Sequence, residues 1–324
     1  MASSFDTTAG TPSAPAAARV AVVVLDWNGG AETLLCLERL HETRSPDLRV
    51  YLVDNASREP VQGEAKRRFP EVVAIRNERN LGYAGGNNVG IRAALADGAE
   101  WVLVLNNDAF VRPDTIVSML AAGARRNDDG PVAAVGARIL RADEPGCLWM
   151  AWGEVTYRQS LVRLVGEGER DGPEFASDRD VPWVSGAAIL LSRHALEDVG
   201  LFDEAYFAYH EEVDWCARAR ERGFRVVYAG AAAVEHRGEA SSGGRSYVGR
   251  KQYLAARNMV RFVRRHGSPA ERFRFAAFLV GTLPLQLVKR TFTAEQYGVW
   301  LKIRGIADAL RERPIPRGEL GLDG

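Results

Sequence analysis

The chain of 324 residues is long enough for one large α/β unit with an additional segment. Hydrophobic residues make up 46% and charged residues 26% of it, which is typical of a soluble protein with a well-formed core. Its 42 basic side chains balance 42 acidic ones, so the overall charge argues against nucleic-acid binding. The three cysteines lack the spacing of a metal or redox motif and are expected to be reduced, as in a cytoplasmic protein.

The beginning of the chain predicts a disordered tail. Residues 1–18 are small, polar and proline-containing, and they lack the basic start and apolar centre of a signal peptide. No run in the chain reaches the roughly 18 apolar residues that are needed to cross a bilayer.

Five short apolar runs predict strands that are covered on both faces. They are RVAVVVLDW at 19–27, RVYLVDN at 49–55, EVVAIRN at 71–77, WVLVLNN at 101–107 and PVAAVGARIL at 131–140. Helix-like stretches separate them, at 31–42, 63–69, 85–98 and 113–127. Alternating strands and helices predict an α/β fold with a Rossmann-like, mostly parallel sheet and helices on both faces.

The pattern changes after residue 140. Residues 141–180 predict a loop-rich segment with one β-hairpin, and 182–200 a strand followed by a short helix. Residues 201–230 predict a loop, a helix that begins near Glu211 and a further strand. A helical region rich in arginine and aromatic residues is expected at 246–312, followed by a loose tail at 313–324.

Polar residues end four of the predicted strands, at Asp26–Asn28, Asp54–Asn55, Arg76–Asn77 and Asn106–Asp108. Each could be an Asx turn or a helix cap, but four together predict one shared crevice at the carboxyl edge of the sheet. A carboxylate beside an amide at this edge suits a hard divalent cation, although Asp108 could equally cap the following turn.

The segment NLGYAGGNNVG at 80–90 is rich in glycine. Its glycines allow a tight turn, and Asn87 and Asn88 are expected at the start of the next helix, where they could meet an anion or a ribose. The segment is neither a P-loop nor the dinucleotide-binding fingerprint. A glycine-rich turn capped by asparagine remains the alternative.

Three acids, Glu211, Glu212 and Asp214, fall in the first turn of a predicted helix. The helix dipole alone would explain them, but they could also supply a general base. Glu211 and Asp214 share a face of the helix, whereas Glu212 projects elsewhere. The acids could therefore divide between substrate binding and proton removal.

Two further groups have both a structural and a functional interpretation. His236 ends a valine-rich strand and could be a ligand or a structural residue. Arg250, Lys251 and Arg257 could balance a diphosphate or merely solvate a helix face.

Seven motifs in a shared order carry a family resemblance across residues 19–240. They are VVVLDWNG, LVDNAS, RNERNLGYAGGNNVGI, VLVLNNDA, WVSGAAILLSR, GLFDEAYFAYHEEVDWCARARERGFRVVYAG and VEHRG. In these motifs the chain resembles a family 2 glycosyltransferase with the GT-A fold, close to the bacterial rhamnosyltransferase-like branch. The resemblance implies a GT-A domain at 19–245, with a nucleotide-binding half at 19–140 and an acceptor and catalytic half at 141–245.

The resemblance implies transfer of a sugar, with inversion, from a nucleotide diphosphate sugar to an acceptor hydroxyl on a glycan or glycolipid in cell-surface polysaccharide synthesis. The branch suggests dTDP-L-rhamnose as donor, with UDP-galactofuranose as a competitor. The nucleotide-sugar pocket is expected to contain Asn28, Asp54 (reading the base), Asn80, Gly82, Asn87, Asn88, Asn106, Asn107 and Arg257.

The same resemblance assigns the remaining roles. Asn106–Asp108 takes the place of the family's DxD motif, with an amide where the first acid is usual. Asp108 and His236 are the expected ligands of Mg²⁺ or Mn²⁺. Glu212 is the expected catalytic base with Glu211 as second choice. The acceptor is expected to contact Asp214, Trp183, Ser185 and Gly186.

Alternative interpretations concern the class of reaction, the presence of catalytic activity and the apolar stretch near the C-terminus. A nucleotidyltransferase would want a basic phosphate loop after the first strand, where this chain has DWNGGAETLL. A transferase-like module that only binds a nucleotide-sugar or glycan is opposed by the intact acid cluster. The apolar stretch at 272–290 could be a buried helix, or it could lie on the inner face of the plasma membrane beside a lipid-linked acceptor. The sequence leaves a homo-oligomer open.

Overall fold

The computed structural model describes residues 19–43, 48–125, 129–158, 160–238, 247–290 and 296–323. The tail expected at 1–18 lies outside the described residues. The strands are β1 (Val20–Asp26), β2 (Leu48–Asp54), β3 (Val73–Arg76), β4 (Trp101–Asn106), β5 (Ala109–Val111), β6 (Val132–Arg141), β7 (Leu148–Met150), β8 (Trp152–Val155), β9 (Val162–Val165), β10 (Arg179–Asp180), β11 (Ala188–Ser192) and β12 (Arg225–His236). The α-helices are α1 (Ala31–His41), α2 (Gln62–Arg68), α3 (Gly82–Ala96), α4 (Thr115–Gly123), α5 (Arg193–Val199), α6 (Glu211–Glu221), α7 (Tyr247–His266), α8 (Pro269–Arg290) and α9 (Gln296–Leu310).

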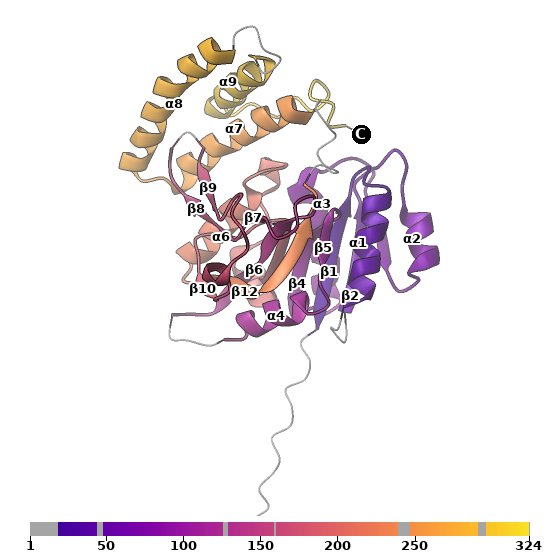
Figure 1. Cartoon of the computed structure of the whole chain (residues 1–324). Coiled ribbons are helices and arrows are strands. Elements are labelled where there is room, and N and C mark those ends of the chain that lie inside the picture. Colours follow the sequence, from indigo (N-terminus) through magenta and orange to yellow (C-terminus); the bar gives the residue numbers. More distant parts are fainter. Residues whose placement is uncertain are drawn as a thin grey trace, which may run out of the picture.

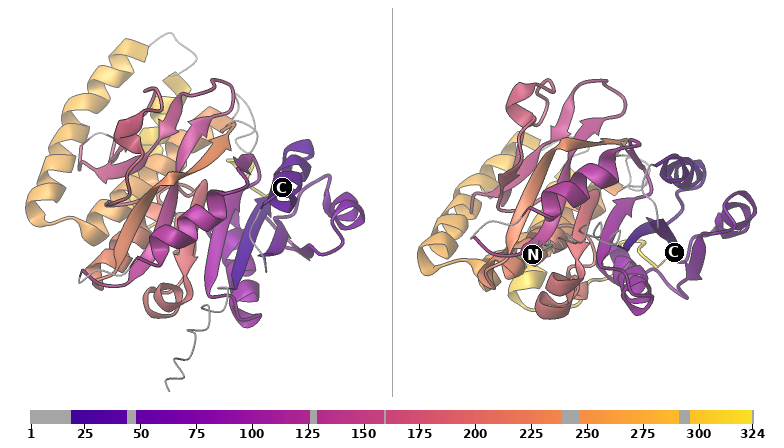
Figure 2. Two further views of the ribbon diagram at one scale, coloured as in Figure 1. Left: turned by 60° about the horizontal axis from the view of Figure 1, so that its bottom comes forward. Right: turned by 90° about the horizontal axis from the view of Figure 1, so that it is seen from below.

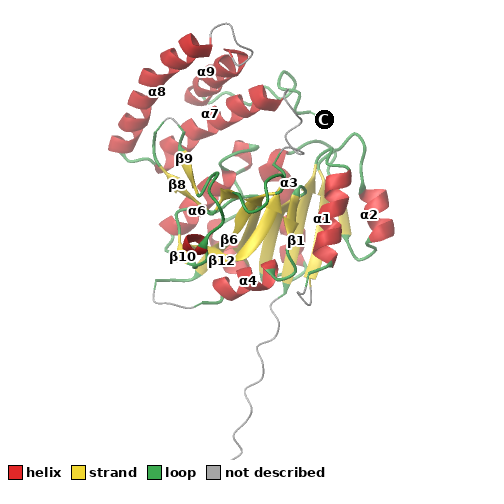
Figure 3. Ribbon diagram, in the orientation of Figure 1, coloured by secondary structure: helices red, strands yellow, loops and turns green. Residues whose placement is uncertain are grey.

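A mixed, mostly parallel sheet forms the centre of the molecule (Figure 1; Figure 3). Its strands follow the order β10-β12-β6-β11-β4-β1-β2-β3, with β5 beside β12 and β7 beside β6. The first four strands run parallel, and β11 lies antiparallel between β4 and β6. The apolar runs of β1, β4 and β6 and the second half of β2 are buried as predicted, because helices cover both faces of the sheet (Figure 2), whereas β3 at the sheet edge is only partly buried.

The glycines of α3 serve helix–sheet packing. A Cβ atom on Gly90 would lie 2.4 Å from Val23 Cγ1, and one on Gly86 would lie 2.5 Å from Leu25 Cδ1. Both distances are too short for real carbon contacts, so only glycine lets this helix lie so close to β1. The glycine-rich run therefore fixes the depth of α3 against the strands.

Two features of the second half differ from expectation. The predicted strand after residue 223 and the segment ending at His236 form one long strand, β12, whose pairing with β6 shifts register between Ala229 and Ala233. The short strand β5 was not predicted, and it pairs with β12 so that His236 stands opposite Ala109. This pairing brings together residues that are more than a hundred positions apart. The expected hairpin is present as β8–β9.

The C-terminal helices α7, α8 and α9 form a separate layer at one end of the molecule, with α8 outermost (Figure 1). Within the described residues, no helix is both long enough and apolar enough to cross a membrane. The loose tail expected at 313–324 is a wrong prediction for the part described, because Leu320 and Leu322 are buried against Phe207 and Tyr253. Arg317 also donates a hydrogen bond to the carbonyl of Asn80.

Candidate active site

The polar ends of the parallel strands lie in register at one edge of the sheet. Asp26 stands opposite Asp54, and Asp54 stands opposite Arg76 on the next strand. On the other side of β1, Asn106 ends β4 beside Leu25. The strand ends that were predicted to share one edge therefore do so.

Asp26 is the centre of a buried hydrogen-bond network at this edge. Its Oδ1 accepts from Gly29 N at 3.0 Å and Thr33 Oγ1 at 2.7 Å, and its Oδ2 accepts from Ser57 Oγ at 3.2 Å. Burial raises the pKa of its carboxyl group. Asn107 points into the same network and donates to Thr33 Oγ1 at 2.9 Å. The nucleotide contact expected of Asn107 does not fit this buried position, since its amide supports the chain beneath the edge.

The residues expected around the nucleotide base are connected through Ser57. Asn28 is exposed, has a φ of 57°, and donates its backbone N–H to Ser57 Oγ at 2.8 Å. Asp54 is fully buried: one oxygen accepts from Ser57 N at 2.8 Å and the other pairs with Arg76. A direct contact between Asp54 and a base does not fit this arrangement, because both oxygens are occupied. Asp54 holds Arg76, whose side chain is partly exposed at the strand edge.

Asn80 and Gly82 shape the turn that leads into α3. Asn80 Oδ1 accepts from Gly82 N and from Asn55 Nδ2, both at 2.8 Å. Gly82 has a φ of +75°, and a Cβ atom there would lie 2.4 Å from the carbonyl oxygen of Phe207. Only glycine is accommodated at this point. These two residues therefore determine the backbone path beside the strand edge.

Helix α3 begins at Gly82, so Asn87 and Asn88 lie in its second turn and the expectation that they start a helix is wrong. Asn88 binds the backbone of Phe202, in the loop that follows α5. Its Nδ2 donates to Phe202 O at 2.9 Å, and its Oδ1 accepts from Phe202 N at 3.1 Å. Its amide is fully used, which does not fit a nucleotide contact. Asn87 donates to Tyr83 O at 2.9 Å and keeps a buried Oδ1 without a hydrogen-bond partner.

Asn106, Asp108 and His236 meet where β4, β5 and β12 converge. His236 Nε2 lies 3.1 Å from Asp108 Oδ1 and 3.3 Å from Asn106 Nδ2. Burial alone would raise the pKa of Asp108, but the hydrogen bond and charge of His236 outweigh it and lower the pKa. The β5–β12 pairing explains this meeting, and the indole ring of Trp149 packs edge-on against His236 at 5.1 Å.

These three side chains have the chemistry that a divalent cation needs. Within the described part of the chain, Asp108 Oδ2 and Asn106 Oδ1 are buried oxygen atoms without a hydrogen-bond partner, and His236 Nδ1 is also unpartnered. Buried polar atoms are normally satisfied, so the two oxygens are candidates for contact with a ligand. Hard cations such as Mg²⁺ and Mn²⁺ prefer oxygen ligands and keep several waters. Among the described residues, no cluster of three or more acidic, histidine or cysteine side chains has metal-binding geometry, so protein groups alone would supply an incomplete shell.

The carboxylates of Glu211 and Glu212 lie side by side at the start of α6. Glu211 is buried and Glu212 partly buried, and each has an Oε2 atom without a hydrogen-bond partner. Burial raises the pKa of Glu212 to about 7. Burial and the neighbouring charge of Glu212 raise the pKa of Glu211 well above its usual value. At neutral pH the pair can therefore hold or accept a proton, as a general base must.

Tyr83 joins the carboxylate pair to the Asp108 site. Its hydroxyl donates to Gly186 O at 2.6 Å. Burial raises the pKa of this phenol well above its usual value, and the charges of Glu211 and Glu212 add to the effect. A smaller contribution of the same sign comes from Asp108. Gly186 lies next to both this hydroxyl and Glu212, since a Cβ atom there would be 3.4 Å from Tyr83 Oη and 3.6 Å from Glu212 Cγ.

The expected acceptor residues Trp183, Ser185 and Gly186 lie in the segment before β11, with different surroundings. Gly186 borders the carboxylate pair, because a Cβ atom there would lie 3.6 Å from Glu212 Cγ. Ser185 is partly buried and accepts from Ala187 N at 3.2 Å. Trp183 is buried, and its indole nitrogen has no hydrogen-bond partner. Gly186 is therefore the member of this group that the structure brings directly to Glu212.

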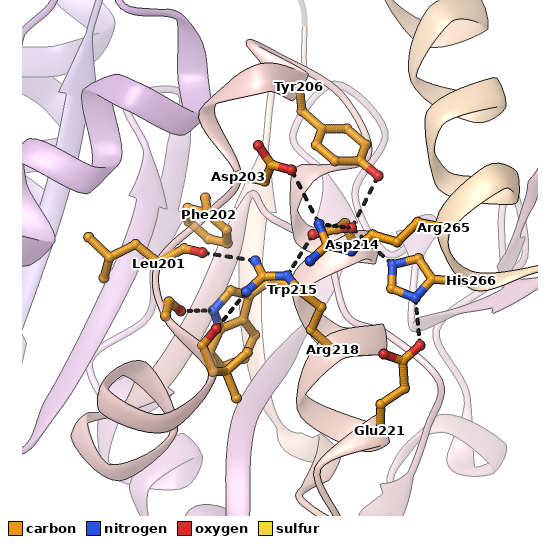
Figure 4. Close-up of polar contacts among 12 residues, drawn as sticks. Leu201, Phe202, Asp203, Tyr206, Asp214, Trp215, Arg218, Glu221, Arg265 and His266 are labelled. Atoms are coloured by element: carbon orange, nitrogen blue, oxygen red, sulfur yellow. Dashed lines mark hydrogen bonds and ion pairs between the residues drawn. The ribbon is translucent and has the colours of Figure 1, made fainter. Parts of the chain in front are cut away.

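Asp214 is a structural residue, which corrects the expectation that it holds an acceptor (Figure 4). It is fully buried, its Oδ2 accepts from Arg218 Nε at 2.8 Å, and its Oδ1 lies 2.9 Å from His266 Nε2. Tyr206 donates to the same Oδ1 at 3.1 Å. Burial alone would raise the pKa of Asp214, but the hydrogen bond of His266 and the charge of Arg218 lower it. No oxygen remains for a substrate, and the network instead connects α6 to α7.

The side chain of Arg257 also contacts other groups of the protein. On α7, its Nη1 donates to Ala205 O at 3.0 Å and its Nη2 lies 3.4 Å from Arg313 O. Burial lowers the pKa of its guanidinium group. The expected diphosphate contact does not fit a side chain that connects two loops. The sequence shows that this position is basic, but it does not show which carbonyl groups the side chain contacts.

Sequence reasoning missed Tyr83 and Asn55 as site residues. Tyr83 lies inside the glycine-rich motif, for which the prediction considered only the glycine and asparagine residues. Asn55 follows Asp54 at the end of a predicted strand. Asn55 binds both Asn80 Oδ1 and Leu81 N, and so holds the turn into α3. Its place at a strand end was a usable signal, whereas nothing in the sequence showed that Tyr83 faces the acids of α6.

Comparisons with known proteins agree on a family. Residues 16–261 match the family model described as glycosyltransferase like family 2. An N-acetylglucosaminyl-diphospho-decaprenol L-rhamnosyltransferase from Mycobacterium tuberculosis is 30% identical over 249 residues, which cover 68% of this chain and 77% of the relative. A pre-mycofactocin glycosyltransferase from the same organism is 30% identical over 228 residues, which cover 69% of this chain and 44% of the relative.

Solved structures of low sequence identity show the fold. The S. aureus protein TarS in complex with UDP-GlcNAc has a TM-score of 0.56 at 16% identity, over 91% of this chain and 82% of that chain. A mannosyltransferase from Pyrobaculum calidifontis, in complex with GDP-Man and Mn²⁺, has a TM-score of 0.52 at 18% identity, over 93% of this chain and 78% of that chain. The fold is of the GT-A type, as predicted.

Proposed function

The chain belongs to glycosyltransferase family 2, and from this membership we propose that it transfers L-rhamnose from dTDP-L-rhamnose, with inversion, to a saccharide on a polyprenyl diphosphate. Such a step would serve the synthesis of a cell-surface polysaccharide. The rhamnosyltransferase relative supports both the donor and the lipid-linked acceptor. The observation that carries the proposal is the pair Glu211–Glu212 at the start of α6, with Gly186 next to both Glu212 and the Tyr83 hydroxyl.

Glu212 acts as the catalytic base in this proposal. An acceptor hydroxyl is a weak nucleophile until a carboxylate removes its proton during attack, and a base works best with a pKa near the working pH. The pKa of about 7 suits Glu212 to this task, and Gly186 leaves space for an acceptor beside its side chain. Burial and the charge of Glu212 raise the pKa of Glu211, which is the second candidate.

The strand edge holds the donor. Asn28 and Arg76 offer exposed polar groups to the nucleoside, and Asn106 and Asp108 face the diphosphate. Asp108, with Asn106 and His236, would hold a divalent cation. When bound, Mg²⁺ or Mn²⁺ would neutralise the negative charge that develops on the leaving nucleoside diphosphate. Attack from the side of Glu212, opposite the diphosphate, inverts the anomeric carbon.

A donor screen tests the binding half of this proposal. The melting temperature is measured with dTDP-L-rhamnose, UDP-galactofuranose and GDP-mannose, each with and without Mn²⁺ or Mg²⁺. A donor at 100 times its Kd stabilises the protein by about 2.7 kcal/mol, so the preferred nucleotide should stand out. We expect dTDP-L-rhamnose to stabilise most and to need the cation. Stabilisation only by UDP-galactofuranose would make that sugar the donor.

Turnover separates the enzyme from a binding module. Labelled dTDP-L-rhamnose is incubated with N-acetylglucosaminyl-diphospho-decaprenol, and transfer of label to the lipid is measured for the wild type and Glu212→Gln. We expect transfer by the wild type and its loss in the variant. Binding of the donor without turnover would argue for a module that only binds it.

The outer face of α8 supports contact with a membrane. Phe273, Val280 and Val288 are 77%, 75% and 74% exposed, and Leu285 on the same helix is 60% exposed. Arginines near the start of the helix and a lysine at its end are exposed as well, at Arg272, Arg274 and Lys289. An apolar helix face with basic ends suits the surface of an anionic bilayer, where a polyprenyl-linked acceptor lies.

Vesicle co-sedimentation tests this contact. Vesicles rich in phosphatidylglycerol are compared with phosphatidylcholine vesicles for the wild type and for the double variant Phe273→Glu/Val280→Glu. Each buried apolar side chain contributes roughly 1.5–3 kcal/mol, so the variant should lose binding by more than about 100-fold. Val117→Glu, on the exposed side of α4, is the matched control and should bind normally. Binding that is equal in all three proteins would refute the contact, and a dimer dissolved by the double variant would assign this face to a second copy.

A further inference from the structure

The turn before α6 has a strained backbone. Phe207, Tyr209 and His210 have φ angles of 62°, 74° and 68°, a region that residues with side chains rarely adopt. His210 is the last residue before α6, and the carboxylate pair follows it directly. Backbone strain of this kind persists only where the surrounding structure holds it in place. The position of Glu212 therefore depends on whatever holds this turn.

Asn258 on α7 contacts the turn at three points. Its Nδ2 lies 2.9 Å from Tyr206 O, 2.8 Å from Ala208 O and 2.8 Å from Tyr209 O. An amide nitrogen carries two N–H groups, so the three carbonyl oxygens surround both of them. Asn258 has no exposed surface, and its Oδ1 faces Arg257 Nη1 at 3.4 Å. Tyr206 O also accepts from Ala208 N at 2.7 Å, so the two N–H groups of Asn258 are available to Ala208 O and Tyr209 O.

The rest of the turn is anchored on other sides. Tyr206 at its start donates to Asp214 on α6 (Figure 4), and Phe207 O accepts from Ala84 N at the start of α3. The guanidinium group of Arg317 lies over the Phe207 ring at 5.3 Å. These contacts connect the turn to the first turn of α3 and to the first turn of α6. The middle of the turn contacts Asn258 through its carbonyl groups and Lys251 through the Tyr209 ring, whose centroid lies 5.8 Å from the Lys251 ammonium group.

We propose that Asn258 is a positioning residue that fixes the turn at residues 206–210 and thereby sets the place of Glu212 in the site. The inference rests on the proposed role of Glu212 as the base. Asparagine is suited to this position because aspartate would face three carbonyl oxygens with a negative charge, and alanine would remove the hydrogen bonds to Ala208 O and Tyr209 O. A displacement of a catalytic group by about 1 Å can lower the rate about 100-fold.

Two variants at this position test the inference. Asn258→Ala removes both N–H groups, and Asn258→Ser retains one short donor in case the alanine variant does not fold. Tyr253→Phe is the matched control, because it removes a buried hydrogen bond from α7 to Asp308, 2.9 Å long, and keeps the ring that packs in one cluster with Phe207. For each protein we measure the melting temperature, the Kd for dTDP by calorimetry, and kcat for transfer from dTDP-L-rhamnose.

A second readout does not depend on the donor. In protein labelled with ¹³C at the glutamate carboxyl groups, the signal missing from Glu212→Gln identifies Glu212, whose pKa is then read by titration. The groups that face the pair are Tyr83 from α3 and Asp214 from α6, and they are the same in every variant. Displacement of the turn admits water, so the pKa should move from about 7 towards 4.5 in Asn258→Ala.

We expect a kcat about 100-fold lower in Asn258→Ala, with the dTDP Kd changed less than threefold and the Glu212 pKa lowered. Tyr253→Phe should lose melting temperature while it keeps its kcat and pKa. A normal pKa and kcat in the Asn258 variants would overturn the inference and leave the proposed function intact. Full activity in Glu212→Gln would instead overturn the proposed base. Failure of both Asn258 variants to fold would show a requirement for folding and so contradict a role confined to positioning.

Discussion

Replacing Glu212 by glutamine should remove activity and raise stability at the same time. The carboxyl group is partly buried, and its pKa rises from 4.5 to about 7. A tenfold change in proton affinity corresponds to about 1.4 kcal/mol, so ionised Glu212 weakens folding by roughly 3 kcal/mol. Because the folded pKa is raised, the stability linked to this group is present below about pH 4.5 and is lost as the pH rises through 7. Glutamine does not ionise and should avoid this loss.

The assay is thermal unfolding of the wild type and Glu212→Gln at pH 8.5 and pH 5. At pH 8.5 the variant should melt on the order of 5 °C higher, and at pH 5 the difference should be small, because the wild-type carboxyl group is then largely protonated. Transfer activity should fall by about 10²–10⁴-fold, the usual contribution of a general base. Glu197→Gln, an exposed pair partner of Arg193, is the control and should change neither property measurably. A variant that is no more stable than the wild type at pH 8.5 would refute the raised pKa.

The remaining predictions concern the metal ligands, the hydroxyl and the buried network. Asp108→Ala should lower transfer by more than about 10³-fold and remove the effect of Mn²⁺ on the melting temperature. Asn106→Asp should keep its transfer activity. Full activity in Asp108→Ala would exclude this residue as a metal ligand. Transfer by the wild type should rise with pH through about 7, since the base must lose its proton; a rate that is flat from pH 5 to 8 would contradict this. Tyr83→Phe should lower kcat about tenfold by freeing the carbonyl of Gly186, and an unchanged kcat would make the hydroxyl dispensable. Asp214→Asn should weaken folding by roughly 3–5 kcal/mol in urea titrations, because it breaks a buried ion pair, and a loss below about 1 kcal/mol would contradict the network.

The carboxyl edge of the sheet could be predicted from sequence because it depends on local patterns. Buried apolar runs define the strands, and parallel pairing brings their ends to one edge, so Asp26, Asp54 and Asn106 were correctly expected to be neighbours. The pattern could not show which polar side chains point inward. Asn107 and Asn88 face the interior because of partners on other elements, Thr33 and Phe202.

For the acids of α6, too, the sequence did not show which side chain points into the interior. Their spacing correctly predicted that the three acids fall in the first turn of one helix, but the family resemblance suggested that Asp214 would hold the acceptor. The groups that neutralise Asp214 come partly from His266 and Arg265 on α7, about fifty residues away in the chain. Such a long-range contact has no local signature. The C-terminal tail differs from expectation for the same reason, since its leucines are buried by Phe207 and Tyr253.

The measurement that tests the central claim most directly is the stereochemistry of transfer. Lipid-linked product from dTDP-L-rhamnose and N-acetylglucosaminyl-diphospho-decaprenol is analysed by NMR, and the anomeric configuration of the new linkage is compared with that of the donor. A single base at Glu212 and a diphosphate held at Asp108 predict one displacement, and therefore an inverted linkage that Glu212→Gln does not form. A retained configuration, or a product formed equally by the variant, would contradict the mechanism.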